Sequence, residues 1–385
     1  MKKTLAALAV LGAFAGSAAA ADVQIYGEID TGLKYQYTET DTFTESGDDV
    51  NTFEMANGIN NGSRFGIKGT EDLGNGLKIG FKLENGFNSD DGTLGYESRL
   101  FGREASVSLY SNYGTLSMGR MGGLGSSAGT YDIVYAIGDA FDGGDEFAWG
   151  LAHSSRYDNM ITYQSPKFYG LQVTAQYSFK ENSKSGDGEE GRSTANRYAA
   201  AAITGEYGPA QFVLAYELQK HSTLIRGNGF EPDDGNTVYL GGNYDFDVAK
   251  VFLMGQYYTG LRSLDFMGLD EVTGLEDNGA LFAASETGAE GFGLHLGTIV
   301  PMFGGELTVG AYWSDGSVSD VQNIGDVDFT YYGAAARYCY PLSTRTTIYT
   351  GLGYSEASVD KYQSSQNQDA KVKTGGIYLG LDHKF

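Results

Sequence analysis

The feature that most constrains this chain is an alternation of apolar and polar side chains with a period of two, repeated along almost its whole length. In the first such segment Val23, Ile25, Ile29 and Leu33 fall on one face, and the residues between them are mostly polar. Successive side chains of a β-strand point to opposite faces, so this pattern indicates a strand with one apolar and one polar side. The last segment of this kind ends at the C-terminal Phe385. No helical period competes with the pattern after the first 21 residues.

The breaks between these segments predict the number of strands. Four of the five prolines stand at short breaks, as expected for a residue that cannot donate to a sheet ladder; they are Pro166, Pro209, Pro301 and Pro341. Such breaks recur about every 43 residues when Asp245-Phe246-Asp247 is counted as one of them. Two earlier breaks, at 71–76 and 111–114, fit the same series. One hairpin per interval of this length predicts about sixteen strands.

Short breaks alternate with long, polar and acidic connections. The expected long connections are residues 38–60, 88–98, 181–195, 222–235, 260–290, 314–328 and 355–370. A long series of strands with short connections at one end and long loops at the other is typical of an outer-membrane β-barrel. A soluble all-β protein would more often have short strands and Gly- or Pro-rich turns. We therefore predict an all-β fold, a closed transmembrane antiparallel barrel of 16 strands, because closure removes unsatisfied edges in lipid.

The first 21 residues have a different character. Lys2 and Lys3 precede an apolar run, and small residues follow it, which is the layout of a secretory signal peptide. Cleavage before Ala21 and before Asp22 both satisfy the small-residue rule, and we favour the second. The sequence thus predicts a signal peptide of residues 1–21 and a single barrel domain of residues 22–385. The lone Cys339 has no partner for a disulfide.

Composition excludes several other classes. The 57 glycines occur without a Gly-X-Y period, and aromatic residues make up 13% of the chain, which excludes collagen and disfavours disorder. The 49 acidic residues against 26 basic ones argue against binding of nucleic acid through a basic surface. The four histidines lack metal-ligand spacing, and no nucleophile or phosphate-loop motif is present. We therefore expect no enzymatic activity, no cofactor and no metal site.

Several motifs at both ends of the chain carry a family resemblance. They are Asp22-Val-Gln-Ile-Tyr-Gly, Ser63-Arg-Phe-Gly-Ile-Lys-Gly-Thr-Glu-Asp-Leu-Gly-Asn-Gly-Leu-Lys, Leu100-Phe-Gly-Arg-Glu-Ala, Gly114-Thr-Leu-Ser-Met-Gly-Arg120, Tyr163-Gln-Ser-Pro-Lys-Phe-Tyr-Gly-Leu and Gly380-Leu-Asp-His-Lys-Phe385. In these motifs the chain resembles the general diffusion porins of Gram-negative outer membranes, whereas its middle matches only as a pattern. The resemblance implies a sixteen-stranded barrel, usually a homotrimer, whose third long loop folds into the lumen and narrows it. The terminal Phe385 resembles the signal that the barrel-insertion machinery reads.

The family's constriction sets basic side chains on the wall against carboxylates on the inserted loop. Carried over by motif, the basic positions are Arg64, Lys82, Arg103 and Arg156. Strand alternation supports Arg64 and Arg156 as lumen-facing, but it puts Arg103 on the apolar face of the strand that follows. Glu28 stands where several members of the family have a lysine, which removes a wall cation, and the resemblance allows Arg120 a role in the subunit contact.

The third loop is expected to span about Met121 to Gly150. The acidic residues in this span are Asp132, Asp139, Asp142, Asp145 and Glu146. Asp142-Gly-Gly stands where the family has a Pro-Glu-Phe-Gly-Gly turn, so the choice of the carboxylates that face the wall stays open within this set. Our predicted constriction residues are Asp139, Asp142, Asp145 and Glu146 with the four basic positions.

The resemblance implies a water-filled channel in the cell outer membrane for passive diffusion of small hydrophilic solutes and ions. Opposing charges across a narrow passage orient solutes and penalise apolar ones. The formal net charge of −23 predicts an enrichment of cations and hence a cation preference. The expected partners are two further copies of the chain, outer-membrane lipid, the permeating solutes and the barrel-insertion machinery. A substrate-specific channel and a structural or adhesive surface barrel remain the alternatives.

Overall fold

The computed structural model describes residues 21–41, 48–185, 188–223, 231–264, 285–321, 325–363 and 366–385. The predicted signal peptide lies outside these residues except for Ala21, so its cleavage stays a prediction. The described helices are the single turns α2 (Gly95–Ser98) and α3 (Tyr135–Gly138) and the 3₁₀ turn η1 (Gly129–Tyr131). No helix in this part of the chain is long and apolar enough to span a membrane.

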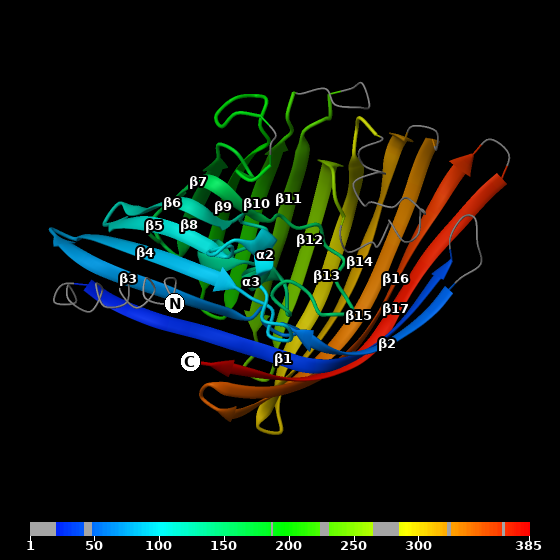
Figure 1. Cartoon of the computed structure of the whole chain (residues 1–385), viewed down its shortest axis with the longest axis horizontal. Coiled ribbons are helices and arrows are strands. Elements are labelled where there is room, and N and C mark those ends of the chain that lie inside the picture. The colour runs from blue at the N-terminus through cyan, green and yellow to red at the C-terminus, as the bar shows by residue number, and fades with distance from the viewer. Residues whose placement is uncertain are drawn as a thin grey trace, which may run out of the picture.

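The described strands form one antiparallel sheet that closes on itself (Figure 1). They are β1 (Ala21–Asp41), β2 (Asp48–Asn57), β3 (Arg64–Gly74), β4 (Leu77–Gly86), β5 (Glu104–Ser111), β6 (Gly114–Gly122), β7 (Arg156–Gln164), β8 (Leu171–Ser178), β9 (Arg197–Tyr207), β10 (Ala210–Lys220), β11 (Gly235–Asp245), β12 (Lys250–Leu261), β13 (Ala289–Met302), β14 (Gly305–Val321), β15 (Gly325–Ser343), β16 (Thr346–Gln363) and β17 (Gln366–Lys384). Apart from β2 and β3, neighbours in sequence pair with each other, and β17 pairs with β1 to close the ring. The predicted closed antiparallel barrel is therefore confirmed.

Seventeen named strands occupy sixteen positions because β2 and β3 lie end to end along β1. Residues 31–40 of β1 pair with β2, and residues 21–28 pair with β3. The break between them is held by the fully buried Asp30, whose Oδ2 accepts the backbone N–H groups of Asn60 (3.1 Å) and Asn61 (2.8 Å). Ser63 Oγ donates to the Asp30 carbonyl at 3.0 Å. One polar side chain thus supplies the hydrogen bonds that the interrupted ladder lacks.

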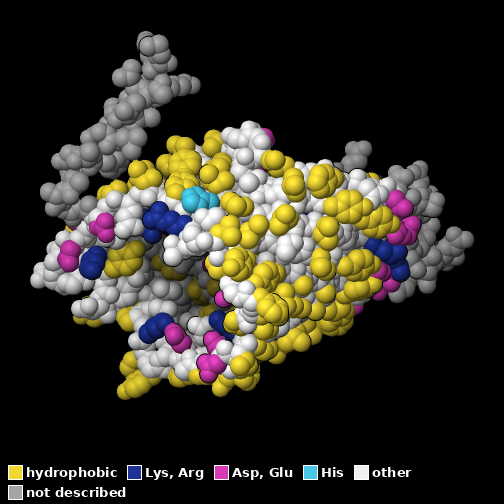
Figure 2. All heavy atoms as spheres, turned by 90° about the horizontal axis from the view of Figure 1, so that it is seen from below, with side chains coloured by type: hydrophobic (Ala, Val, Ile, Leu, Met, Phe, Trp, Pro, Cys, Tyr) yellow, Lys and Arg dark blue, Asp and Glu magenta, His cyan; other side chains and the backbone are white. Residues whose placement is uncertain are grey.

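The barrel has its apolar side chains outside and its polar side chains inside. Ile25 on β1 is 62% exposed, whereas Asp30 on the opposite face of the same strand is 0% exposed. Figure 2 shows hydrophobic side chains spread over the outer wall and charged side chains around a hollow. This distribution of apolar and polar side chains is the reverse of that in a soluble protein. It is typical of a barrel whose outer face contacts lipid.

The predicted short breaks all fall at connections between consecutive strands, each within a few residues. Pro301 and Pro341 lie in the last residues of β13 and β15 rather than in the turns. The expected long loops at 38–60, 314–328 and 355–370 are wrong over most of their length. Strand continues to Asp41 in β1, to Val321 in β14 and to Gln363 in β16, and β2 occupies Asp48–Asn57. Strands that extend beyond the hydrocarbon layer need no apolar face, so their polar composition resembled that of a loop.

The interior of the barrel is filled in part by residues 123–155, which we call the inner loop. This segment connects β6 to β7 and carries η1 and α3. Its hydrogen bonds reach successive inner-wall residues from β9 to β17: Leu124 N–H to the Tyr198 hydroxyl (3.0 Å), Asn243 Nδ2 to the Ile137 carbonyl (2.8 Å) and Trp149 N–H to the Tyr331 hydroxyl (2.9 Å). The main hydrophobic cluster lies between this loop and that wall.

Candidate functional site

A polar cavity of about 700 Å³ lies between the inner loop and the part of the wall that carries β3, β5 and β7. Its Lys, Arg, Asp and Glu lining residues come from both sides: Arg64, Arg103 and Arg156 from the wall, and Asp132, Asp142, Asp145 and Glu146 from the inner loop. Three of the four predicted wall cations and three of the four predicted loop carboxylates therefore meet at one cavity. Lys82 and Asp139 do not line it.

Most of the wall cations are paired with wall carboxylates on the adjacent strand. Arg64 Nη2 lies 2.8 Å from Glu28 Oε2, and Arg103 Nε donates to Glu84 Oε1 at 2.8 Å. Lys82 does not line the cavity. Its Nζ lies 2.9 Å from Glu104 Oε2 and 3.5 Å from Glu84 Oε2. These pairs neutralise much of the positive charge that the motifs predicted at the wall.

Arg103 lines the cavity although alternation places it on the apolar face. Its side chain is buried, with the residue only 6% exposed, and it points inward to Glu84. Because β5 begins at Glu104, Arg103 precedes the strand and its direction is not set by the period of two. The structure therefore places Arg103 at the cavity and not on the apolar outer face that alternation predicted, and its role at the constriction stays a prediction.

Arg156 differs from the other wall cations. No Asp or Glu of the described residues lies within 4 Å of its guanidinium, and its buried Nε has no hydrogen-bond partner there. It lies instead over the ring of Tyr96, 4.7 Å from the ring centroid. The face of an aromatic ring attracts a cation without contributing a negative charge of its own.

Asp139 anchors the inner loop rather than lining the cavity. It is 2% exposed, and its Oδ1 accepts the Tyr312 hydroxyl and the Phe141 N–H, both at 2.8 Å. His295 Nε2 lies 3.3 Å from the same oxygen and accepts the Ala140 N–H at 3.2 Å. These contacts tie the tip of the loop to β13 and β14, across the barrel from the wall arginines.

The carboxylates that do line the cavity are held by contacts within the loop and to the wall. Asp132 and Asp142 share a hydrogen bond, and burial together with the charge of Asp142 raises the pKa of Asp132 to about 8. Burial likewise raises the pKa of Asp142 and of Asp145. The Tyr378 hydroxyl donates to Asp145, and Glu146 accepts Lys34 Nζ at 2.6 Å. The Asp132–Asp142 pair therefore holds one proton near neutral pH.

Sequence reasoning missed the residue that fastens both ends of the inner loop. Glu217 on β10 accepts the Gly125 N–H at 2.8 Å and Ser154 Oγ at 3.0 Å, and it also accepts the hydroxyls of Tyr198 and Tyr239. The available signal was a carboxylate on an inward face that is otherwise Val213 and Ala215. A fully buried carboxylate needs such a set of donors to be tolerated.

The charges at the cavity nearly balance. Its lining residues and their direct ion-pair partners comprise four cations and six carboxylates: Lys34, Arg64, Arg103 and Arg156, with Glu28, Glu84, Asp132, Asp142, Asp145 and Glu146. With one proton on the Asp132–Asp142 pair, a single negative charge remains in excess. The described residues contain no cluster of three or more His, Cys, Asp or Glu side chains that would suit a metal ion. The chemistry that this arrangement supports is transient attraction of charged and polar solutes.

Comparison with known proteins adds an independent line of evidence. A family model described as Gram-negative porin matches residues 6–360. An outer membrane porin protein of Bordetella pertussis is 33% identical, and the alignment covers 100% of both chains. The outer membrane porin protein 32 of Delftia acidovorans is 27% identical, again over 100% of both chains.

Solved structures agree on the fold. The anion-selective porin from Comamonas acidovorans superposes with a TM-score of 0.65 at 24% identity, covering 95% of this chain and 100% of that chain. Salmonella typhi OmpF, solved in complex with daunomycin, superposes with a TM-score of 0.60 at 15% identity, covering 94% and 97%. At these identities the likeness establishes the barrel architecture alone.

Proposed function

Because this chain belongs to the Gram-negative porin family and is an outer-membrane protein, we propose that it forms an open, water-filled channel for passive diffusion of small hydrophilic solutes and ions. The observation that carries this proposal is the polar cavity of about 700 Å³ between the inner loop and the wall. The loop narrows the interior but leaves a passage with opposed charges. Such a passage favours hydrated and polar solutes over apolar ones.

The proposed constriction consists of the charged residues that meet at this cavity and their partners. On the wall these are Arg64, Arg103 and Arg156, with Lys82 acting through Glu84. On the loop they are Asp142, Asp145 and Glu146, and we add Asp132 to this proposal because it lines the same cavity. Asp139 contributes by anchoring the loop tip and is not proposed to touch solute.

We further propose that the channel prefers cations. Arg64 and Arg103 are each paired with a wall glutamate, so Arg156 is the wall cation that faces the loop carboxylates without a paired Asp or Glu in the described residues. The excess negative charge at the cavity has the same sign as the net charge of the whole chain. The anion-selective porin named above is 24% identical and shares the fold, so its selectivity is a property of that protein.

Assembly is proposed from family membership and from the chain end. Membership of the porin family supports a homotrimer in the outer membrane, and we propose this state for the chain. The last residue, Phe385, pairs its backbone with Gly27 of β1, donating its N–H at 3.0 Å and accepting at 3.1 Å. We propose that Phe385 is also read by the barrel-insertion machinery before this pairing forms.

Planar-bilayer recording of the purified, folded protein tests the proposal. We expect stepwise, ohmic conductance, and a zero-current potential in a salt gradient that shows cations to be more permeant. Absence of steady conductance would overturn the open channel. A zero-current potential of the opposite sign would leave the channel intact and overturn the cation preference. Block of the current by one class of solute at low concentration would instead indicate a substrate-specific channel.

A further inference from the structure

The connection between β4 and β5 contains a backbone conformation that L-residues rarely adopt. Tyr96, Glu97 and Ser98 have φ values of 53°, 58° and 57°, so three successive residues other than glycine are left-handed. Each such residue carries an energetic cost, and a run of three persists only where surrounding contacts hold it. The contacts around this turn therefore indicate what the conformation is for.

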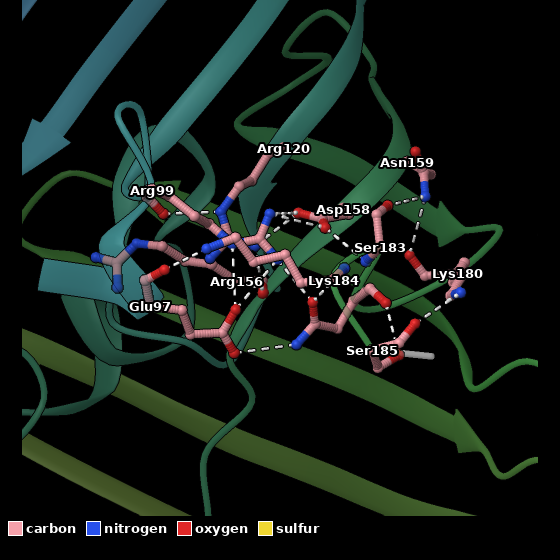
Figure 3. Close-up of polar contacts among 12 residues, drawn as sticks. Glu97, Arg99, Arg120, Arg156, Asp158, Asn159, Lys180, Ser183, Lys184 and Ser185 are labelled. Atoms are coloured by element: carbon pink, nitrogen blue, oxygen red, sulfur yellow. Dashed lines mark hydrogen bonds and ion pairs between the residues drawn. The ribbon is translucent and has the colours of Figure 1, made fainter. Parts of the chain in front are cut away.

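A network that we call the loop latch fastens the turn to β7 and to the connection between β8 and β9. It consists of Glu97, Arg99, Asp158, Asn182 and Lys184. Figure 3 shows Glu97, Arg99, Asp158 and Lys184 of this network. Arg99 lies 3.1 Å from Asp158 Oδ2 and donates to Asn182 Oδ1 at 2.6 Å. Asn182 Nδ2 donates to Glu97 Oε1 at 3.1 Å, and Lys184 Nζ donates to the Glu97 carbonyl.

Asp158 extends the latch to the neighbouring strands. Its Oδ1 lies 2.7 Å from Arg120 Nη1, and its Oδ2 accepts the Ser183 N–H at 2.8 Å. Arg120 also donates to the Gly102 carbonyl at 2.8 Å. The role between subunits that the resemblance allows Arg120 stays a prediction.

The latched turn sends Tyr96 into the cavity. Arg103 Nη1 donates to the Tyr96 hydroxyl at 2.7 Å, and the ring carries the Arg156 guanidinium at 4.7 Å. Glycines make room for this ring, since a Cβ at Gly86 would lie 2.3 Å from Tyr96 Cε2 and one at Gly102 would lie 2.4 Å from Tyr96 Cβ. Arg156 has no Asp or Glu partner in the described residues, so this ring is the contact that fixes its guanidinium at the wall.

We propose that Tyr96 is a positioning residue of the constriction, and that the loop latch sets ion selectivity by holding Tyr96 in place. This inference rests on the proposed channel function. With the ring removed, the Arg156 side chain is free to swing toward Asp132 and Asp142, whose charges it already faces across the cavity. That movement puts a cation in the middle of the passage and neutralises a loop carboxylate. Both changes reduce cation preference, and the first also narrows the passage.

The experiment compares permeability ratios from zero-current potentials, and single-channel conductance, for the full-length folded protein and four variants. We expect Tyr96→Leu to lower the cation-to-anion permeability ratio about twofold or more and to reduce conductance. Tyr96→Phe, which keeps the ring, should give a smaller shift in the ratio. Asn182→Ala, which opens the latch, should shift the ratio in the same direction as Tyr96→Leu. Tyr113→Leu is the matched control, because this tyrosine is 85% exposed in the turn between β5 and β6.

A double variant separates positioning from general damage to the barrel. In an Arg156→Gln background, Tyr96→Leu should no longer change the permeability ratio, because the side chain that Tyr96 positions is gone. An unchanged ratio in Tyr96→Leu alone, or an equal shift with and without Arg156, would overturn the inference. If Tyr96→Leu fails to assemble, Asn182→Ala with and without Arg156→Gln decides by the same criterion. Loss of all conductance in the wild type would instead count against the proposed channel.

Discussion

Replacing Asp132 by asparagine should abolish a pH-dependent step in ion selectivity. Burial and the charge of Asp142 raise the pKa of Asp132 to about 8, so the group is protonated near neutral pH and loses its proton in mildly alkaline solution. The constriction therefore gains one negative charge as the pH rises through this value, and cation preference rises with it. An asparagine keeps a donor for the bond to Asp142 and never gains the charge.

The size of the step follows from the cavity. A sphere of its volume, about 700 Å³, has a radius of about 5.5 Å, and one charge at that distance changes the energy of a monovalent ion by about 0.75 kcal/mol in water. Screening at about 0.1 M salt reduces this to about 0.4 kcal/mol. Because the charge attracts cations and repels anions equally, the permeability ratio should rise about fourfold.

The assay is the zero-current potential in a fixed salt gradient, measured between about pH 6 and about pH 10. The wild type and Asp132→Asn should agree at the acidic end and diverge by about fourfold in permeability ratio at the alkaline end. Groups that titrate independently of Asp132 contribute equally to both proteins, so the difference reports the Asp132–Asp142 pair. Parallel titration curves for the two proteins would refute the reasoning, because they would show that Asp132 does not change charge in this range.

Three further predictions concern single side chains. Arg156→Gln should raise the cation-to-anion permeability ratio at neutral pH by about fourfold by the same Coulomb estimate, and an unchanged zero-current potential would contradict its place at the constriction. Glu217→Leu leaves the donors at Gly125 and Ser154 without an acceptor, at a cost of about 1–3 kcal/mol each. The inner loop is then held less firmly, so the noise of the open-channel current should increase. A current trace as quiet as that of the wild type would contradict the role of Glu217 as the loop anchor. Deleting Phe385 should reduce assembly in cells much more than refolding in detergent, judged by heat-modifiable mobility on gels, and an equal loss in both would indicate a packing role alone.

The fold was predictable because its signal is local. An alternation with a period of two is written into each strand separately, and the breaks between strands count the hairpins. The break between β2 and β3 was not predictable, because it depends on Asp30, which lies on another strand about 30 residues earlier. The lengths of β14 and β16 were underestimated because a polar sequence shows that a segment lies in water and does not show whether it is strand or loop.

The charged residues of the site were predictable by type and less so by direction. The family motifs predicted that Arg64 and Arg156 lie at the constriction. They did not predict that Arg64 pairs with Glu28, because that contact depends on the register between β1 and β3. Within the inner loop, sequence spacing alone does not show which part of the wall each carboxylate faces. Asp139 faces β14, on the opposite side of the barrel from the wall arginines. The sequence therefore shows which charged residues are available at a constriction, but strand register determines which of them form ion pairs and so neutralise each other.

That distinction makes the salt dependence of selectivity informative. The net charge of −23 acts mainly through exposed residues at the mouths, and their field is screened within about 3 Å at 1 M salt but reaches about 10 Å at 0.1 M. The constriction charges act on ions about 5.5 Å away, so high salt screens them as well, but less than it screens the more distant charges at the mouths. We expect cation preference to fall between these two concentrations and then to level off above unity, the remainder being the share of the constriction. Arg156→Gln should raise cation preference at both salt concentrations, by less at about 1 M than at about 0.1 M. A preference that vanishes entirely at high salt would show that the paired charges at the cavity cancel, and that the mouths alone select.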